Sequence, residues 1–173
     1  RKASFRDIVI LLRTLSGWDE VFKRVLEEEG IPVHVTSRIG YFAAAEVQEL
    51  LHFLRILDNP LQDIPLYGVL HAYLGGFSEE EIALVRAAYP KKRYLYDALR
   101  ACAADLTASL HQKAAAFLEK IDRYRSLAVY TSVHELLQTI LRESGYLSYV
   151  AARPEGGRRR ANVEMLLVKA ADY

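Results

Sequence analysis

The sequence is poor in several residues and patterns, and each scarcity excludes a class of protein. Its 173 residues contain one cysteine, Cys102, which excludes an internal disulfide framework, leaves no zinc pattern and fits a reducing cytoplasm. No apolar run approaches the roughly 20 residues of a membrane-spanning helix, so we expect no membrane partner. The net charge of +1 gives no global basic signal, so any contact with nucleic acid must come from local patches.

Catalytic signatures are missing as well. The sequence has no Walker A glycine loop, no Gly-x-Gly-x-x-Gly and no His-Glu-x-x-His, and its five histidines are dispersed without metal-ligand spacing. The acidic runs at 27–29 and 79–81 are typical of solvated faces and helix N-termini rather than of acid–base pairs. Taken alone, the chain is predicted to have no catalytic residue, no metal site and no cofactor.

The strongest strand signal is the segment from Asp7 to Arg13, where five apolar residues stand between an acid and an arginine. An apolar stripe then predicts a helix that Gly30 ends, and Val33 and Val35 predict a short second strand. These elements predict a βαβ unit with two parallel strands. Two strands do not make a stable sheet, so we expect their partners in other parts of a longer polypeptide, of which this chain is a piece.

The remaining sequence is dominated by helical periodicity. Helices are expected at about 43–57, with Val47, Leu50, Leu51, Leu54 and Leu57 buried, and after capping boxes that begin at Ser78 and Ser132. The run from Arg153 to Arg160 is predicted to be a loop. The fold class is therefore mainly α, with a small βαβ piece at 1–59 and an all-helical domain at 60–173 that is incomplete at its C-terminal end. We place the boundary near Asn59–Asp63.

Three features suggest binding chemistry, and each has a plainer alternative. Arg13, at the end of the predicted strand, is suited to contact a phosphate, or it is a surface residue at a strand end. Gly75, Gly76 and Ser78 form a turn that offers backbone N–H groups to a DNA phosphate, or an ordinary turn of a helical hairpin. The basic clusters Lys91, Lys92, Arg93 and Arg158, Arg159, Arg160 can neutralise phosphates, or they are solvated loops.

Several segments in order resemble one known family. DIVILLRT, EEEGIPVHV and GYFAAAEVQELLHFLRILDNPLQDIPL resemble the start of the second RecA-like (P-loop NTPase) motor domain of UvrD/Rep-type superfamily 1 DNA helicases. GGFSEEEIALVR, ESGYLSYV and RRANVEMLL are closer still to the AddA subunits of bacterial AddAB helicase–nucleases. The turn departs from related helicases, because it has Gly-Gly-Phe where they favour Gly-Ile-Gly.

The resemblance implies that residues 1–59 open the second motor domain and residues 60–173 form the inserted 2B accessory domain. It implies a 3′ to 5′ DNA helicase and exonuclease that acts in double-strand break repair and recombination. Arg13 would reach the γ-phosphate of ATP, which the full-length protein holds with Mg²⁺. The implied partners are duplex DNA with a single-stranded tail and an AddB-like subunit. From the residues alone, the alternative is a helical docking module with no nucleic-acid binding of its own.

Overall fold

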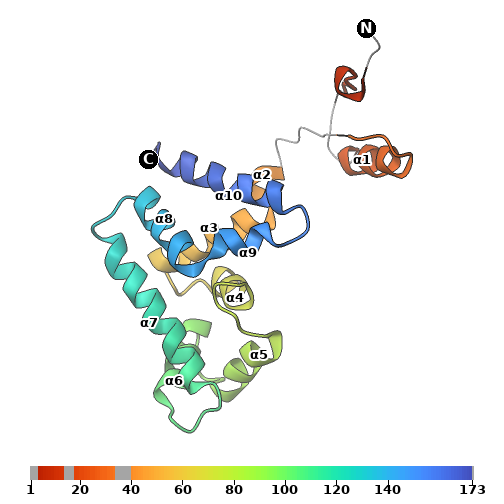
Figure 1. Cartoon of the computed structure of the whole chain (residues 1–173). Helices are drawn as coiled ribbons and strands as arrows, with labels where there is room; N and C mark the ends of the chain where they lie inside the picture. The colour runs from red at the N-terminus through yellow and green to blue at the C-terminus, as the bar shows by residue number, and fades with distance from the viewer. Residues whose placement is uncertain (1–3, 14–17, 34–39, 173) are drawn as a thin grey trace. The chain divides into compact units, whose positions relative to one another are not determined.

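The computed structural model describes residues 4–13, 18–33 and 40–172, and these divide into two compact units (Figure 1). The first unit is Arg1–Ala43 and the second is Ala44–Tyr173. No described helix is long and apolar enough to cross a membrane.

The first unit contains short helical elements and an extended segment. Its helices are the 3-10 helix η1 (Phe5–Asp7), α1 (Asp19–Glu28) and α2 (Gly40–Ala43). The predicted helix after the first strand is confirmed by α1, and its predicted stop is confirmed too. Gly30 adopts φ +72°, and the N–H of Ile31 donates to the carbonyl of Leu26 at 2.8 Å, which is the hydrogen bond of a Schellman end.

The predicted βαβ unit is not seen. Residues 8–12, expected as a buried strand, are not part of a sheet, and the side chain of Leu11 is 90% exposed. Val33 is likewise unpaired, whereas His34 and Val35 lie outside the described residues. A strand exists only through hydrogen bonds to a neighbouring strand, and the described residues supply no such partner. The coarser prediction of a mainly α chain is confirmed.

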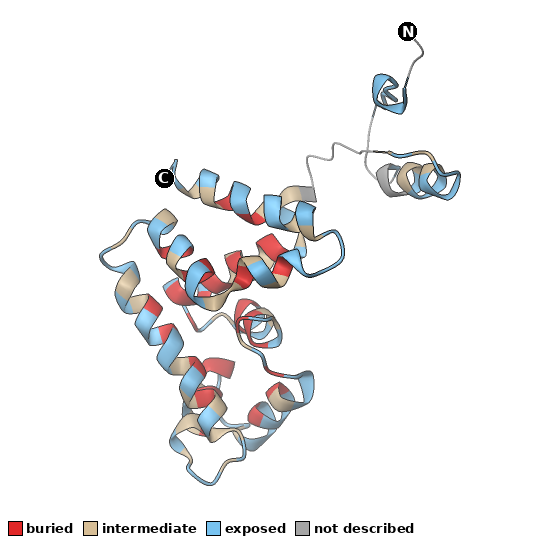
Figure 2. Ribbon diagram, viewed as in Figure 1, coloured by how far each residue is buried: buried red, intermediate tan, exposed pale blue. Residues whose placement is uncertain are grey.

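The second unit is a bundle of helices around α3 (Ala45–Asp58). This helix packs against α4, which follows it in the chain, and against α7 and α10, which are distant in sequence. Figure 2 shows the buried residues gathered where these helices meet. The other helices are α4 (Asp63–His71), α5 (Glu79–Ala88), α6 (Leu95–Ala104), α7 (His111–Ala128), α8 (Val133–Ser144), α9 (Tyr146–Ala151) and α10 (Gly156–Ala170).

The central position of α3 changes which of its residues are buried. Val47, Leu50 and Leu57 are buried as predicted, but Leu51 and Leu54 are only half-buried. Phe53 and Ile56 are buried instead. A single apolar stripe suits a helix that packs on one side, whereas α3 has neighbours on several sides.

The predicted domain boundary near Asn59–Asp63 stays a prediction. The compact units meet at Ala43 and Ala44, so α3, which was assigned to the first domain, packs within the second unit.

Local signals placed several helix ends correctly. Ser78 and Ser132 both form capping boxes, in which the serine Oγ accepts from the N–H three residues later. Gly145 ends α8 with φ +67°, as expected for a glycine stop. Because these helix ends depend on residues close in sequence, the spacing of residue types was sufficient to predict them.

The predicted loop from Arg153 to Arg160 is partly wrong, because α10 begins at Gly156. Arg158, Arg159 and Arg160 therefore lie in the first turns of a helix. A Cβ atom on Gly156 would lie 2.0 Å from the carbonyl oxygen of Ala151. The glycine that resembled a loop signal is thus needed for the close approach of α9 and α10.

Candidate nucleic-acid interface

The turn between α4 and α5 carries the predicted phosphate contacts at Gly75, Gly76 and Ser78. The N–H groups of Gly75, Gly76 and Phe77 donate to carbonyl oxygens of the preceding segment at 2.8–3.1 Å. The N–H of Ser78 donates to Glu81 Oε2 at 2.8 Å. All four donors of the turn are therefore used within the chain, and the local reason for expecting an anion site here is lost.

The first turn of α5 adds negative charge beside the same turn. Glu79, Glu80 and Glu81 occupy its first three positions. A hydrogen bond from Ser78 lowers the pKa of Glu80, and one from Lys113 lowers the pKa of Glu81, so both are ionised near neutral pH. These carboxylates are favourable at a helix N-terminus and oppose a phosphate at that position.

The two glycines of the turn are expected to tolerate substitution differently. A Cβ on Gly75 would lie 2.4 Å from the carbonyl oxygen of Val69, so Gly75→Ala should cost about 2 kcal/mol of folding free energy. Gly76 has φ +70° and open space, so Gly76→Ala should cost only the strain of about 1 kcal/mol. Urea unfolding of the two variants measures the difference. Equal costs would contradict the packing argument.

The basic loop, residues Lys91, Lys92 and Arg93, connects α5 to α6. All three residues are exposed, and none forms an ion pair with the described residues. Arg86 Nη1 donates to the Lys92 carbonyl at 2.6 Å, and the loop ends where the Leu95 N–H donates to Asp63 Oδ1 at 2.9 Å. The loop thus presents cations to solvent from an anchored backbone.

The other predicted cluster, Arg158–Arg160, is paired with acids inside the chain. Arg158 pairs with Glu155, and Arg160 Nε lies 2.7 Å from Glu164 Oε1, both at exposed positions. Arg159 Nη1 lies 2.7 Å from Oε2 of the buried Glu46. The exposed pairs leave Arg158 and Arg160 accessible to solvent, whereas Arg159 is half-buried and paired with a buried acid.

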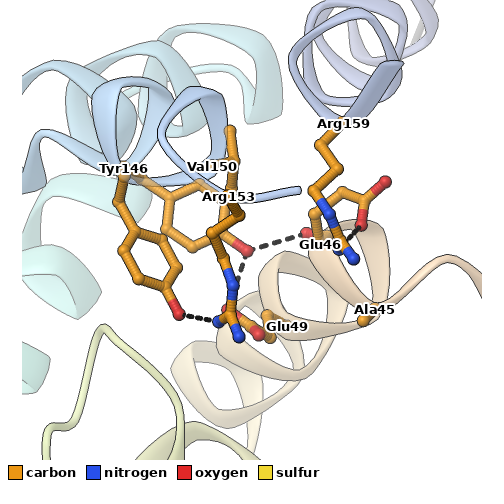
Figure 3. Close-up of a pocket in the computed structure, with 8 residues that line it drawn as sticks. Ala45, Glu46, Glu49, Tyr146, Val150, Arg153 and Arg159 are labelled. Atoms are coloured by element: carbon orange, nitrogen blue, oxygen red, sulfur yellow. Dashed lines mark hydrogen bonds and ion pairs between the residues drawn. The ribbon is translucent and has the colours of Figure 1, made fainter. Parts of the chain in front are cut away.

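Glu46 is the centre of a polar junction between α3, α9 and α10 (Figure 3). Its side chain is 4% exposed, and its second oxygen accepts from Asn162 Nδ2 at 2.7 Å. Burial raises the pKa of Glu46, but the hydrogen bonds from Asn162 and Arg159 and the charge of Arg159 outweigh it and leave the pKa below its usual value. A buried carboxylate is thus kept ionised by two partners more than 110 residues away.

Tyr146 completes the junction. Its hydroxyl lies 2.8 Å from Glu49 Oε2 and 3.1 Å from the Glu46 carbonyl oxygen, and the ring is fully buried. Burial, together with the charge of Glu49, raises the pKa of Tyr146 well above the ordinary phenol value. The hydroxyl therefore keeps its proton at neutral pH and donates it in these hydrogen bonds.

A pocket of about 190 Å³ lies beside this junction. It is lined by Ala45, Glu46, Glu49, Tyr146, Tyr149, Val150, Arg153 and Arg159. Its two arginines and two glutamates balance in charge, and Arg153 contacts the Tyr149 hydroxyl. Because its polar groups serve contacts between helices, the junction holds α10 on α3. The sequence carried no signal for this site, since Glu46 resembles an ordinary acid of a helix first turn.

Arg13 is exposed at the end of the extended segment of the first unit. Its exposure leaves the guanidinium accessible, and the γ-phosphate contact stays a prediction. No group of three or more metal-ligating side chains occurs among the described residues.

Comparison with known proteins assigns the chain to a family. The sequence profile of the UvrD-like helicase C-terminal domain matches residues 1–152. The A subunits of the ATP-dependent helicase/nucleases of Acetivibrio thermocellus, Ruminiclostridium cellulolyticum and Bacillus velezensis are 42%, 39% and 39% identical, each over the whole chain. The chain spans 14% of the length of each of these relatives. The resemblance found in the sequence is confirmed: the chain belongs to the family of UvrD-like helicase C-terminal domains.

Proposed function

We propose that this chain is part of an ATP-dependent 3′ to 5′ DNA helicase and nuclease subunit, and that it positions duplex DNA without catalysing a reaction itself. The whole protein would act in double-strand break repair and recombination, together with an AddB-like subunit. The observation that carries the proposal is the basic loop, whose three exposed cations have no acidic partner among the described residues. Family membership supplies the class of substrate.

In this proposal, residues 1–59 open the second RecA-like motor domain and residues 60–173 form the accessory domain. The exposed apolar residues Ile8, Val9, Ile10 and Leu11 support the first assignment. Four consecutive exposed apolar residues are costly in water and suit a strand that pairs within a larger sheet. That sheet would be made with segments of the longer protein.

The chain's residues would then have two roles. Lys91, Lys92 and Arg93 would neutralise phosphates of the duplex and hold it at the α5–α6 end of the helical unit. Arg13 would contact the γ-phosphate of ATP and stabilise charge during hydrolysis. Hydrolysis of ATP would supply the driving force for movement of the motor domains. Residues outside this chain would hold the ATP and its Mg²⁺.

Neutralising the basic loop should weaken DNA binding in a salt-dependent way. Each lost phosphate contact reduces the slope of log K against log salt by about 0.9, so Lys91→Gln, Lys92→Gln and Arg93→Gln together should reduce it by up to about 3. The measurement is binding of a labelled duplex with a 3′ single-stranded tail between about 50 and 200 mM salt. The charge-conserving control is Lys91→Arg, Lys92→Arg and Arg93→Lys, which should keep the slope. An unchanged slope in the neutralised variant would exclude the loop as a phosphate contact.

The second candidate function is a helical docking module. Ile64 on α4 is 82% exposed and Tyr67, one turn further, is 43% exposed, so this helix offers apolar surface to a protein partner. The same binding experiment distinguishes the two. Absence of DNA binding at low salt would favour the docking module, since a protein contact need not depend on phosphates.

A further inference from the structure

A second and larger pocket lies next to the turn between α4 and α5. Its volume is about 390 Å³, and it is formed by side chains of α3, α7 and α8 and by Tyr73 and Leu74, which follow α4. Phe53, Leu74 and Ile140 give it a buried apolar base. The remaining lining residues are polar or aromatic: Tyr73, Lys120, Tyr124, Glu143 and Ser144.

Lys120 brings a positive charge to this pocket. Its Nζ donates to the carbonyl oxygen of Leu74 at 3.0 Å, and among the described residues no carboxylate lies within 4 Å of it. An ammonium group has three N–H donors, so two remain for other acceptors. Lys120 as a whole is exposed, so its charge is open to a ligand from solvent, while partial burial against the pocket lowers its pKa.

The other polar groups of the pocket are already partnered. Glu143 Oε2 is held by the Arg123 guanidinium and accepts from the Tyr124 hydroxyl at 2.9 Å, so its charge is balanced. The Ser144 Oγ donates to the Ile140 carbonyl at 2.6 Å, and the Tyr73 hydroxyl donates to the Ser144 carbonyl at 3.0 Å. Lys120 is therefore the one lining cation of the described pocket without an acid.

Lys120 lies directly beside the glycine turn. Leu74, whose carbonyl holds Nζ, precedes Gly75 and Gly76, whose own N–H groups are used within the chain. Lys113, two turns earlier on α7, is paired with Glu81. Of these two lysines of α7 beside the turn, Lys120 is the one whose charge is free to bind an anion.

We propose that Lys120 and this pocket form an anion site that takes a phosphate of the DNA backbone. A lysine binds phosphate as a point charge and needs no bidentate geometry. Tyr73, stacked on Tyr149 at 4.1 Å between ring centres and 43% exposed, offers an aromatic surface beside the site that suits a sugar or a base. This inference rests on the proposed DNA-binding function, and a carboxylate of a partner protein is the competing ligand.

The first test compares Lys120→Gln with Lys120→Arg in the tailed-duplex assay. Loss of one phosphate contact should reduce the salt slope by about 0.9, so between about 50 and 200 mM salt the affinity of Lys120→Gln should change about 3-fold less than that of the unchanged chain. Lys120→Arg should keep the slope, and so should Arg142→Gln, an exposed control on α8. An unchanged slope in folded Lys120→Gln, as judged by circular dichroism, would overturn the proposal.

A second test does not depend on DNA binding. Inorganic phosphate is titrated into the unchanged chain while the side-chain NMR signal of Lys120 is followed, with Lys113 as the internal reference. Bound phosphate should raise the pKa of Lys120. The signal of Lys113, which is paired with Glu81, should not respond to phosphate. If the chain binds no DNA, the proposed function fails, and this titration alone decides the anion site. If phosphate does not shift the Lys120 signal selectively, the proposal is overturned. A shift with acetate but none with phosphate would assign the site to a carboxylate and would also overturn the proposal.

Discussion

Replacing Glu46 with alanine should destabilise the helical unit by about 3 kcal/mol. The substitution leaves Arg159 and Asn162 without the acceptor that they share at 2.7 Å, inside the contact between α3 and α10. Removing one partner of a buried pair costs about 3–5 kcal/mol, and we expect the low end because the Arg159 side chain is 28% exposed. Urea unfolding measures the loss.

The matched control is Glu164→Ala on the outer face of α10. Glu164 also pairs with an arginine at 2.7 Å, but both partners are about half exposed, so the cost should be about 1 kcal/mol or less. Equal costs at Glu46 and Glu164 would show that burial of the junction contributes nothing.

The same junction predicts a pH dependence of stability. The pKa of Glu46 is lower in the folded chain than the ordinary value of 4.5, so the unfolded state binds the proton more readily. The contribution of Glu46 is therefore present above about pH 4.5 and is lost as pH falls from that value through the folded pKa. The difference in unfolding midpoint between the unchanged chain and Glu46→Gln should shrink over that range. A constant difference down to about pH 3 would contradict the assignment.

Arg13→Ala should reduce kcat for ATP hydrolysis about 10³-fold in the complete helicase subunit that we propose. An arginine that reaches the γ-phosphate stabilises charge that develops in phosphoryl transfer, and such arginines contribute factors of about 10³ to 10⁵. ATP turnover in the presence of single-stranded DNA measures the effect.

Lys23→Ala, on the neighbouring helix α1, is the control for loss of a cation from the first unit. It should leave kcat within about 2-fold, because charge without contact with the phosphate contributes little across solvent. A kcat for Arg13→Ala close to that of the control would remove the γ-phosphate role from Arg13.

The helices and many of their ends were determined by the sequence itself. Ser78 and Ser132 each cap a helix with a partner three residues away, and Gly30 and Gly145 end helices with a positive φ. Such features depend on interactions within one turn, so residue type and spacing are sufficient to predict them. The family was likewise visible in the order of short segments along the chain.

Only the tertiary structure decided which polar and charged groups remain free to bind a ligand. The N–H groups of the Gly75–Gly76 turn and the guanidinium of Arg159 look like phosphate donors in the sequence, but contacts within the fold use them. The segment at 8–12 has strand composition and no strand beside it among the described residues. Lys120, which no pattern singled out, keeps its charge unpaired within the described part of the chain. Arg159 and the segment at 8–12 depend on a partner distant in sequence or on its absence, and local spacing carries no information about such partners. The turn finds its acceptors nearby, but only its folded backbone shows which N–H groups they occupy.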